Sequence, residues 1–364
     1  MDELNEMIHK FKSLLVLLSV TSMMVCAQSG VSKDNSIAIG FLVNKQNEGD
    51  AKFGAQLAID EINQSGGIHG RDLRLVTRSM EGSWGAGSAE VVDLVFTEKV
   101  SAILGSIDGR NSHVAEQVIA KTGVVYISAW ASDPSLSKAY VPWYFSVVPT
   151  DDQQASDILN SIGGQKQAQK ILVIHEESYD AEQALKSLKA TSNRMKNRTL
   201  SSMSTASFNT EDFVTAIKSK EVNAIILLGR QLPLSLICNA LQESGMAIPV
   251  YLSLSVSASP EYPENSFSAN MQMQMIAPNP VFISTLSTYK KPFEKNNRLT
   301  SRAVSAYAYD GIKIIAAAML KSNERMDSLR ESLLKIKYQG VTGLIQFDAQ
   351  GRLKNSGEVV LLEE

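Results

Sequence analysis

The sequence predicts an α/β protein built from two doubly wound, Rossmann-like lobes. Short apolar runs rich in valine and isoleucine alternate with amphipathic segments along most of the chain, which is typical of buried parallel strands separated by helices. The alternation is broken at residues 149–152 and then starts again, so the strands fall into two series. The chain has 364 residues, and at about 100–200 residues per domain this length also predicts two domains.

The first strand–helix–strand unit is predicted within residues 36–76. One face of its helix carries Ala55, Ala58, Ile59 and Ile62. Their spacing is typical of an amphipathic helix. Gly66 and Gly67 follow, and glycine permits the left-handed backbone conformation that ends many helices. We therefore predict a helix that stops at these glycines, between a strand at 36–43 and a strand that begins at Leu73.

The rest of the first series continues this alternation. Helices are predicted at 86–99 and 113–122, and strands at 100–105, 124–128 and 143–148. The second series begins after residue 152, with Thr150 or Asp151 as the cap of its first helix. Its first helix ends at 162, and further helices are predicted at 181–195, 211–219 and 234–244. Its strands are predicted at 170–175, 224–228 and 250–254. Thr210 is predicted to cap the helix at 211–219.

The last part of the chain is expected to return to the first lobe. Residues 277–280 contain two prolines and predict a crossing between the lobes. Helices are predicted at 281–296, 300–322 and 327–335, followed by an extended segment at 343–348 and a strand at 358–362. These strands are too few for a third domain, so we expect the helices to cover the first sheet.

Composition limits the classes of partner. Hydrophobic residues make up 44% of the chain and charged residues 20%, which is ordinary for a globular protein. The formal net charge is −3 and no basic stripe is present, so a nucleic-acid partner is not expected.

Residues 1–27 are expected to be an export signal. A basic patch at 9–12 precedes an apolar stretch at 14–25, the order found in signal peptides. Acidic residues before the patch make Met7 an alternative start to Met1.

Two routes of signal processing remain open. Cleavage after Ala27 is favoured because small residues precede that bond, and lipidation of Cys26 is the alternative. Both routes place the protein outside the cytoplasm, in the periplasm. Cys238 is then the one remaining cysteine, so no disulfide within the chain is expected, and we interpret it as a small buried hydrophobic residue.

Several segments of the sequence carry a resemblance to a known family. They are GAQLAIDEIN (54–63), GGIHG (66–70), ILGS (103–106), YISA (126–129), FSVVPTD (145–151) and GLIQFD (343–348). In this order they resemble the branched-chain amino-acid type of periplasmic binding protein. The resemblance implies a type I fold of two lobes joined by three crossings, with the ligand held between them. We accordingly expect lobe I at 36–148 plus 280–354 and lobe II at 149–279 plus 355–364.

The ends of the predicted strands supply the candidate ligand-binding residues of the first lobe. Open parallel sheets bind ligands at the carboxyl ends of their strands. The loops at those ends contain Asp108, Gly109, Arg110, Asn111, Ser128, Trp130 and Ser132. The first loop leads into a helix N-terminus, which favours an anion. The resemblance implies that both loops hold a ligand carboxylate and part of its side chain. A solvated position for Arg110 and a core position for Trp130 are the alternatives.

The resemblance implies further contacts from the second lobe. These would come from Tyr179, Arg230, Ser253 and Ser255. Amino-acid binders of the family place an acidic residue near 253–255 to hold the α-amino group, whereas this chain has Ser-Leu-Ser there. A buried ammonium without a partner is costly. Glu176, Glu177 and Asp108 are the candidates to replace that acid.

Other classes of protein find less support in the sequence. It has no glycine-rich dinucleotide motif and no G-x-S-x-G motif, and its histidines show no metal-ligand spacing. We therefore expect neither an enzyme nor a cofactor or metal, and interpret His113 as a surface or capping residue. An export signal stands where a transcription regulator would need its DNA-binding helices. The expected partners are a small molecule and the membrane subunits of an ABC importer, with a membrane sensor as the alternative, and the expected mechanism is hinge closure.

Overall fold

The structure is a computed structural model. It describes residues 35–45, 48–82, 86–138, 140–163, 169–195, 197–262, 273–277, 302–322, 326–355 and 358–361. The export signal expected at 1–27 and the helix expected at 281–296 lie outside the described residues. None of the described helices is both long and apolar enough to span a membrane.

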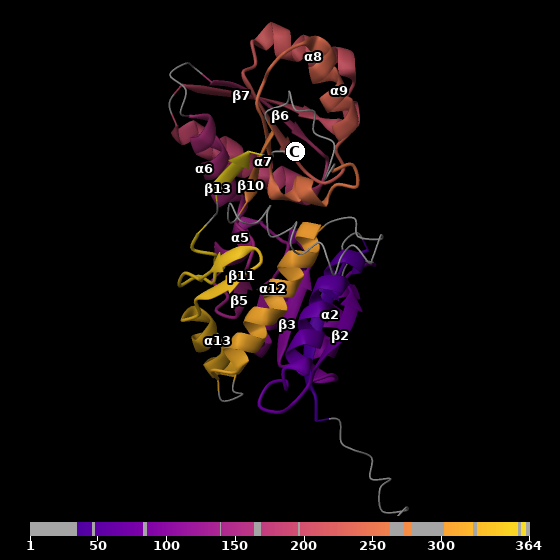
Figure 1. Cartoon of the computed structure of the whole chain (residues 1–364), viewed down its shortest axis with the longest axis vertical. Helices are drawn as coiled ribbons and strands as arrows, with labels where there is room; N and C mark the ends of the chain where they lie inside the picture. The colour runs from indigo at the N-terminus through magenta and orange to yellow at the C-terminus, as the bar shows by residue number, and fades with distance from the viewer. Residues whose placement is uncertain are drawn as a thin grey trace, which may run out of the picture. The chain divides into compact units, whose positions relative to one another are not determined.

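The first sheet is parallel and is formed by strands from the first series. Its strands are β1 (Ile37–Val43), β2 (Leu73–Ser79), β3 (Ala102–Ser106), β4 (Tyr126–Ser128) and β5 (Tyr144–Ser146), in the order β2-β1-β3-β4-β5 (Figure 1). Ile39 of β1 pairs with both Leu75 of β2 and Ala102 of β3. All seven residues of β1 are buried, as expected for a strand covered on both faces.

Helices cover the first sheet, and one pair of them comes from opposite ends of the chain. They are α2 (Glu48–Gln64), α3 (Ala86–Phe96), α4 (Gly109–Thr122), α5 (Pro134–Lys138), α12 (Arg302–Met319) and α13 (Met326–Leu334). α12 lies along α2 in Figure 1, which confirms the predicted return of the chain. The pair packs closely because position 54 is glycine; a Cβ there would lie 1.9 Å from the Ser305 carbonyl oxygen.

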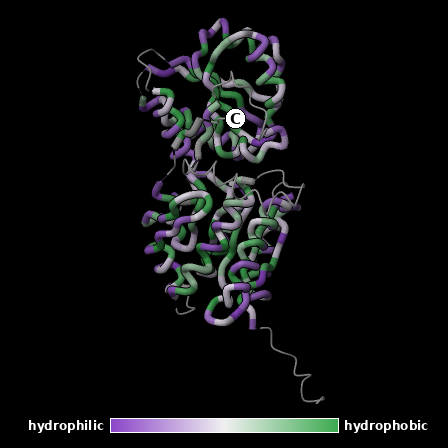
Figure 2. Tube along the Cα trace, in the orientation of Figure 1, coloured by the Kyte–Doolittle hydropathy of each residue, from purple (hydrophilic) through white to green (hydrophobic). Residues whose placement is uncertain are grey.

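The second sheet is also parallel, apart from its last strand. Its strands are β6 (Gln169–His175), β7 (Arg198–Ser204), β8 (Ala224–Leu228), β9 (Val250–Leu252), β10 (Met273–Ala277) and β13 (Glu358–Leu361), in the order β13-β10-β9-β8-β6-β7. β13 runs antiparallel to β10. Hydrophobic stretches, green in Figure 2, run through both lobes, and the buried strands β3 and β8 belong to these cores.

Three of the four described helices of the second lobe begin at a side-chain cap, and the fourth follows Pro233, which forms no capping hydrogen bond. The four are α6 (Asp151–Ile162), α7 (Tyr179–Arg194), α8 (Thr210–Lys220) and α9 (Leu234–Ser244). Thr150 is the cap of α6 and forms a capping box with Gln153. The prediction that Thr210 caps α8 is wrong, because Asn209 is the cap and its side chain accepts a hydrogen bond from the Asp212 backbone N–H.

The chain passes between the two sheets three times. It leaves the first sheet after β5, returns between β10 and α12, and crosses again before β13. Before the last crossing, the hairpin of β11 (Tyr338–Gly340) and β12 (Gly343–Ile345) is held by Asp310, which accepts hydrogen bonds from Val341 and Thr342. The fold is therefore the predicted one of two doubly wound lobes joined by three crossings. The exact lobe boundaries stay a prediction.

Candidate functional site

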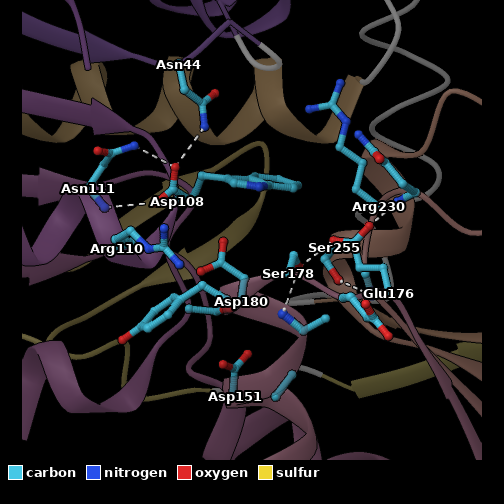
Figure 3. Close-up of a pocket in the computed structure, with 18 of the residues that line it drawn as sticks. Asn44, Asp108, Arg110, Asn111, Asp151, Glu176, Ser178, Asp180, Arg230 and Ser255 are labelled. Atoms are coloured by element: carbon cyan, nitrogen blue, oxygen red, sulfur yellow. Dashed lines mark hydrogen bonds between the residues drawn. The ribbon is translucent and has the colours of Figure 1, made fainter. Parts of the chain in front are cut away.

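A pocket of about 780 Å³ lies where the strands of the two sheets end. Its lining includes Asn44 after β1, Asp108 after β3 and Ser132 after β4, all from the first lobe. The second lobe contributes Glu176 after β6 and Arg230 after β8 (Figure 3). The position agrees with the strand-end rule, and the volume is typical of a small-molecule site.

Most of the residues predicted for the site line this pocket. They are Asp108, Arg110, Asn111, Trp130, Ser132, Tyr179, Arg230 and Ser255. Trp130 also packs edge-on against Tyr307, with 6.3 Å between ring centroids, so it belongs to both the pocket wall and the lobe core. Arg110 lies over the Tyr179 ring at 5.7 Å from its centroid.

Three predicted residues do not line the pocket. Ser128 is fully buried and donates a hydrogen bond to the Ala131 carbonyl oxygen. Ser253 is buried, and its Oγ lies 2.8 Å from Ser255 Oγ, so it can hold Ser255 in place from behind. Gly109 lies where the two lobes approach each other, and its backbone bonds to Asp180 of the second lobe.

Several residues that line the pocket were missed by the prediction. They include the polar residues Asn44, Glu81, Asp151, Gln154 and Asp180. Asn44 directly follows β1, so the strand-end rule applied to every strand would have found it. Asp151 and Asp180 stand in the first turns of α6 and α7, where acidic residues are common for local reasons.

The start of α4 is surrounded by carboxylates of the protein itself. Helix α4 begins at Gly109, four residues earlier than predicted, because Asp108 caps it: Asp108 Oδ1 accepts a hydrogen bond of 2.9 Å from the Asn111 backbone N–H. The Gly109 N–H donates to Asp180 Oδ1 at 2.9 Å. Two of the N–H groups that we expected to receive a ligand carboxylate are therefore bonded to aspartates in this structure.

The candidates for the missing acid also have partners within the protein. Glu176 accepts hydrogen bonds from Ser178 Oγ at 2.7 Å and from the Gln231 backbone N–H. Glu177 accepts one from Ser204 Oγ at 2.8 Å. Asp108 Oδ2 accepts one from Asn111 Nδ2 at 2.7 Å.

His113 was interpreted as a surface or capping residue; its side chain is 31% exposed and also bridges two acidic groups of the first lobe. Its Nε2 lies 3.1 Å from Asp133 Oδ2 and its Nδ1 lies 3.3 Å from Glu116 Oε2. The hydrogen bonds to Asp133 and Glu116 raise the pKa of His113 to about 9 despite partial burial. Burial alone would raise the pKa of Asp133, but hydrogen bonds from His113 and Ser135 lower it overall.

Asp151 and Asp180 have the opposite environment. Burial raises the pKa of Asp151 well above its usual value, opposed by a hydrogen bond with Ser132. Burial likewise raises the pKa of Asp180 to about 7, although the bond from Gly109 lowers it. Figure 3 shows both on the same side of the pocket, across from Arg230 and Glu176. Within the described residues, no group of three or more His, Cys, Asp or Glu side chains is arranged to hold a metal ion.

Comparison with known proteins places the chain in a family. The model of the family described as periplasmic binding protein matches residues 44–360, so the chain belongs to this family. A curated relative, an amino acid binding protein of Pseudomonas aeruginosa, is 27% identical over 123 residues, which are 34% of this chain. The match spans only 33% of that relative's own length.

Solved structures of the same fold hold different ligands. The branched-chain amino acid transporter substrate-binding protein LivJ of Streptococcus pneumoniae, in complex with isoleucine, has a TM-score of 0.70 at 23% identity and is matched over 90% of this chain and 100% of its own. An ABC transporter solute-binding protein of Rhodopseudomonas palustris, in complex with 3,4-dihydroxybenzoic acid, has a TM-score of 0.67 at 15% identity, over 90% and 91%. At these identities the likeness establishes the fold. The family and these neighbours are solute-binding proteins, not enzymes.

Proposed function

We propose that this chain is an extracytoplasmic solute-binding protein that captures a small polar ligand between its lobes and delivers it to an ABC importer. The ligand class is an amino acid or a related carboxylate or amide. The observation that carries the proposal is the pocket itself, because residues from both sheets line it and a small molecule inside it contacts both lobes. The ligands named for the solved neighbours support the size class.

The proposed mechanism is closure about the three crossings. A ligand that touches both lobes binds the closed form more tightly than the open form and so shifts the equilibrium toward closure. The membrane subunits of the importer would recognise the closed, loaded form. The export signal expected at 1–27 would deliver the protein to the periplasm, where such a partner is reached.

A thermal-shift screen of the chain purified after export tests this proposal. The panel contains amino acids, their amides and small carboxylates. A ligand at about one hundred times its Kd adds about 2.7 kcal/mol to the free energy of unfolding. At about 2–4 °C per kcal/mol the melting temperature should rise by about 5–10 °C. The shift should shrink in Arg230→Ala, which alters the pocket, and persist in the control Lys170→Ala, whose side chain pairs with Glu221 away from it. No shift with any member of the panel would overturn the proposal.

A further inference from the structure

The pocket is strongly acidic. Six carboxylates line it, against the two guanidinium groups of Arg110 and Arg230. Most of these carboxylates are engaged: Glu81 Oε1 accepts a hydrogen bond of 2.9 Å from the Lys45 backbone N–H, and Asp108, Glu176 and Glu177 have the partners described above. Asp151 and Asp180 have one hydrogen bond each, with Ser132 and from the Gly109 N–H.

Asp151 is a buried carboxylate with one oxygen left over. Its residue is 5% exposed, and its side chain has a hydrogen bond with Ser132. In the described part of the chain its Oδ2 has no hydrogen-bond partner. Figure 3 shows the carboxylate pointing toward Asp180. A buried carboxylate oxygen without a partner is costly, and an incoming donor, above all a cation, would remove that cost.

Two other cations of this region are already paired with other carboxylates. His113 pairs with Asp133, and Lys138 Nζ lies 2.9 Å from Asp152 Oδ2. Among the described residues, the ion pairs include none with Asp151 or Asp180, and the one hydrogen bond of the Asp180 side chain is the bond from the Gly109 N–H. The charges of Asp133 and Asp180 act on Asp151. Two neighbouring acids on one side of the pocket thus have no ion pair among the described residues, and Arg110 on the same side stacks over the Tyr179 ring.

We propose that Asp151 and Asp180 form a subsite for the ammonium group of the ligand, so that the pocket takes a small primary amine. The proposal rests on the function proposed above and specifies its ligand class. A metal ion fits these two residues less well than an ammonium group does. A dedicated metal site uses three or more protein ligands, and two carboxylates are fewer than that. An amine is the better fit, because an ammonium carries one charge and three donors and can bond to both carboxylates.

The subsite would explain why this chain can have serine instead of an acidic residue at 253–255. The family resemblance placed an acid there to hold the ligand's amino group, and this chain has none. Asp151 begins α6 directly after the first crossing, and Asp180 lies in the first turn of α7. The ammonium would therefore be held beside the junction of the lobes, where its binding also offsets the repulsion between the two carboxylates.

Calorimetric titration of paired probes tests the proposal. The pairs differ in the amine alone: leucine against 4-methylpentanoate, 4-aminobutanoate against butanoate, and glutamate against glutarate, with 3,4-dihydroxybenzoate and Ca²⁺ as further probes. We expect binding to be confined to members with an amine. We also expect Asp151→Asn and Asp180→Asn to weaken that binding about 10- to 100-fold, the range for loss of a charge-assisted hydrogen bond. The matched control Asp152→Asn changes the adjacent residue, which pairs with Lys138 and Ser187, and should leave affinity unchanged.

The outcomes separate this inference from the proposed function. Tight binding of an amine-free carboxylate, or of Ca²⁺ alone, would overturn the ammonium subsite and leave a solute-binding protein. The subsite would also be overturned if both asparagine variants, with circular dichroism spectra like the wild type, bound the amine at wild-type affinity. Silence across all the probes would overturn the proposed function, and the subsite with it.

Discussion

The Tyr179 hydroxyl donates a hydrogen bond of 2.8 Å to Asp133 Oδ2 and so joins the first turn of α7 in the second lobe to the loop after β4 in the first. The bond from the Gly109 N–H to Asp180 Oδ1 joins the same two regions. Direct hydrogen bonds thus link the lobes at one edge of the pocket. In the proposed mechanism, closure about the hinge would make and break these bonds, and they would then set part of the balance between open and closed forms.

Removing the Tyr179 hydroxyl should weaken ligand binding without emptying the pocket wall. In Tyr179→Phe the ring still lies under Arg110, but the bond to Asp133 is lost. A hydrogen bond to a charged group contributes about 1.5–3 kcal/mol, so the apparent affinity for the ligand should fall by up to about 10- to 100-fold. Calorimetry gives the affinity, and small-angle scattering should report a more expanded ligand-free protein. Tyr140→Phe, at a side chain that is 75% exposed, is the control. Unchanged affinity in Tyr179→Phe would show that the bond does not bias closure.

The His113–Asp133 pair should make stability depend on alkaline pH. The folded-state pKa of His113 is raised to about 9, above the usual value of about 6.5. The pair therefore contributes fully below about pH 6.5, and its contribution declines as the pH rises through about 9. Urea unfolding between pH 6 and pH 10 should show this decline in the wild type and a flatter profile in His113→Gln. Parallel profiles for the two proteins would contradict the assignment.

Asp180 should lower stability at neutral and alkaline pH. Its folded-state pKa is raised to about 7, so the folded protein holds this proton more tightly than the unfolded chain does. The sign is opposite to that of an ion-paired aspartate: stability falls as the pH rises from about 4 to about 7. Asp180→Asn, which can still accept from the Gly109 N–H, should be more stable than the wild type at pH 8 and similar at pH 4. Urea unfolding at the two values measures this, and equal stability at pH 8 would count against it. A site that keeps a destabilising charge is consistent with a role in binding.

The sequence predicted the buried part of the fold better than its edges. The strand at 224–228 and the helix at 234–244 were predicted with the observed bounds, because apolar periodicity is strongest where residues are buried. Strand β7 was missed. Its segment RTLSSMS carries few apolar side chains and lies at the edge of the sheet, where burial leaves little pattern to detect.

The residues of the candidate site were also predicted only in part, for a different reason. The strand-end rule located Asp108 and Arg110 because it depends on topology alone. Asp151 was interpreted as a possible helix cap, since local sequence cannot distinguish it from Thr150 in that role. The structure shows that Thr150 forms the capping box, which leaves the Asp151 side chain available to the pocket. Only the packing of the two lobes reveals that difference.

The close packing of α2 on α12 should make position 54 intolerant of any side chain. A Cβ at Gly54 would lie 1.9 Å from the Ser305 carbonyl oxygen, and this oxygen belongs to backbone that cannot rotate away. Gly54→Ala should therefore force the helices apart and cost about 1–3 kcal/mol in the free energy of unfolding, as overpacking does elsewhere. Gly49→Ala in the same helix is the matched control, because a Cβ there meets nothing within 4 Å. Alanine is the better helix former, so the control should be neutral or gain up to about 1 kcal/mol. Urea unfolding of the two variants measures this difference. If Gly54→Ala were as stable as Gly49→Ala, the packing of α12 on α2 would not depend on this contact.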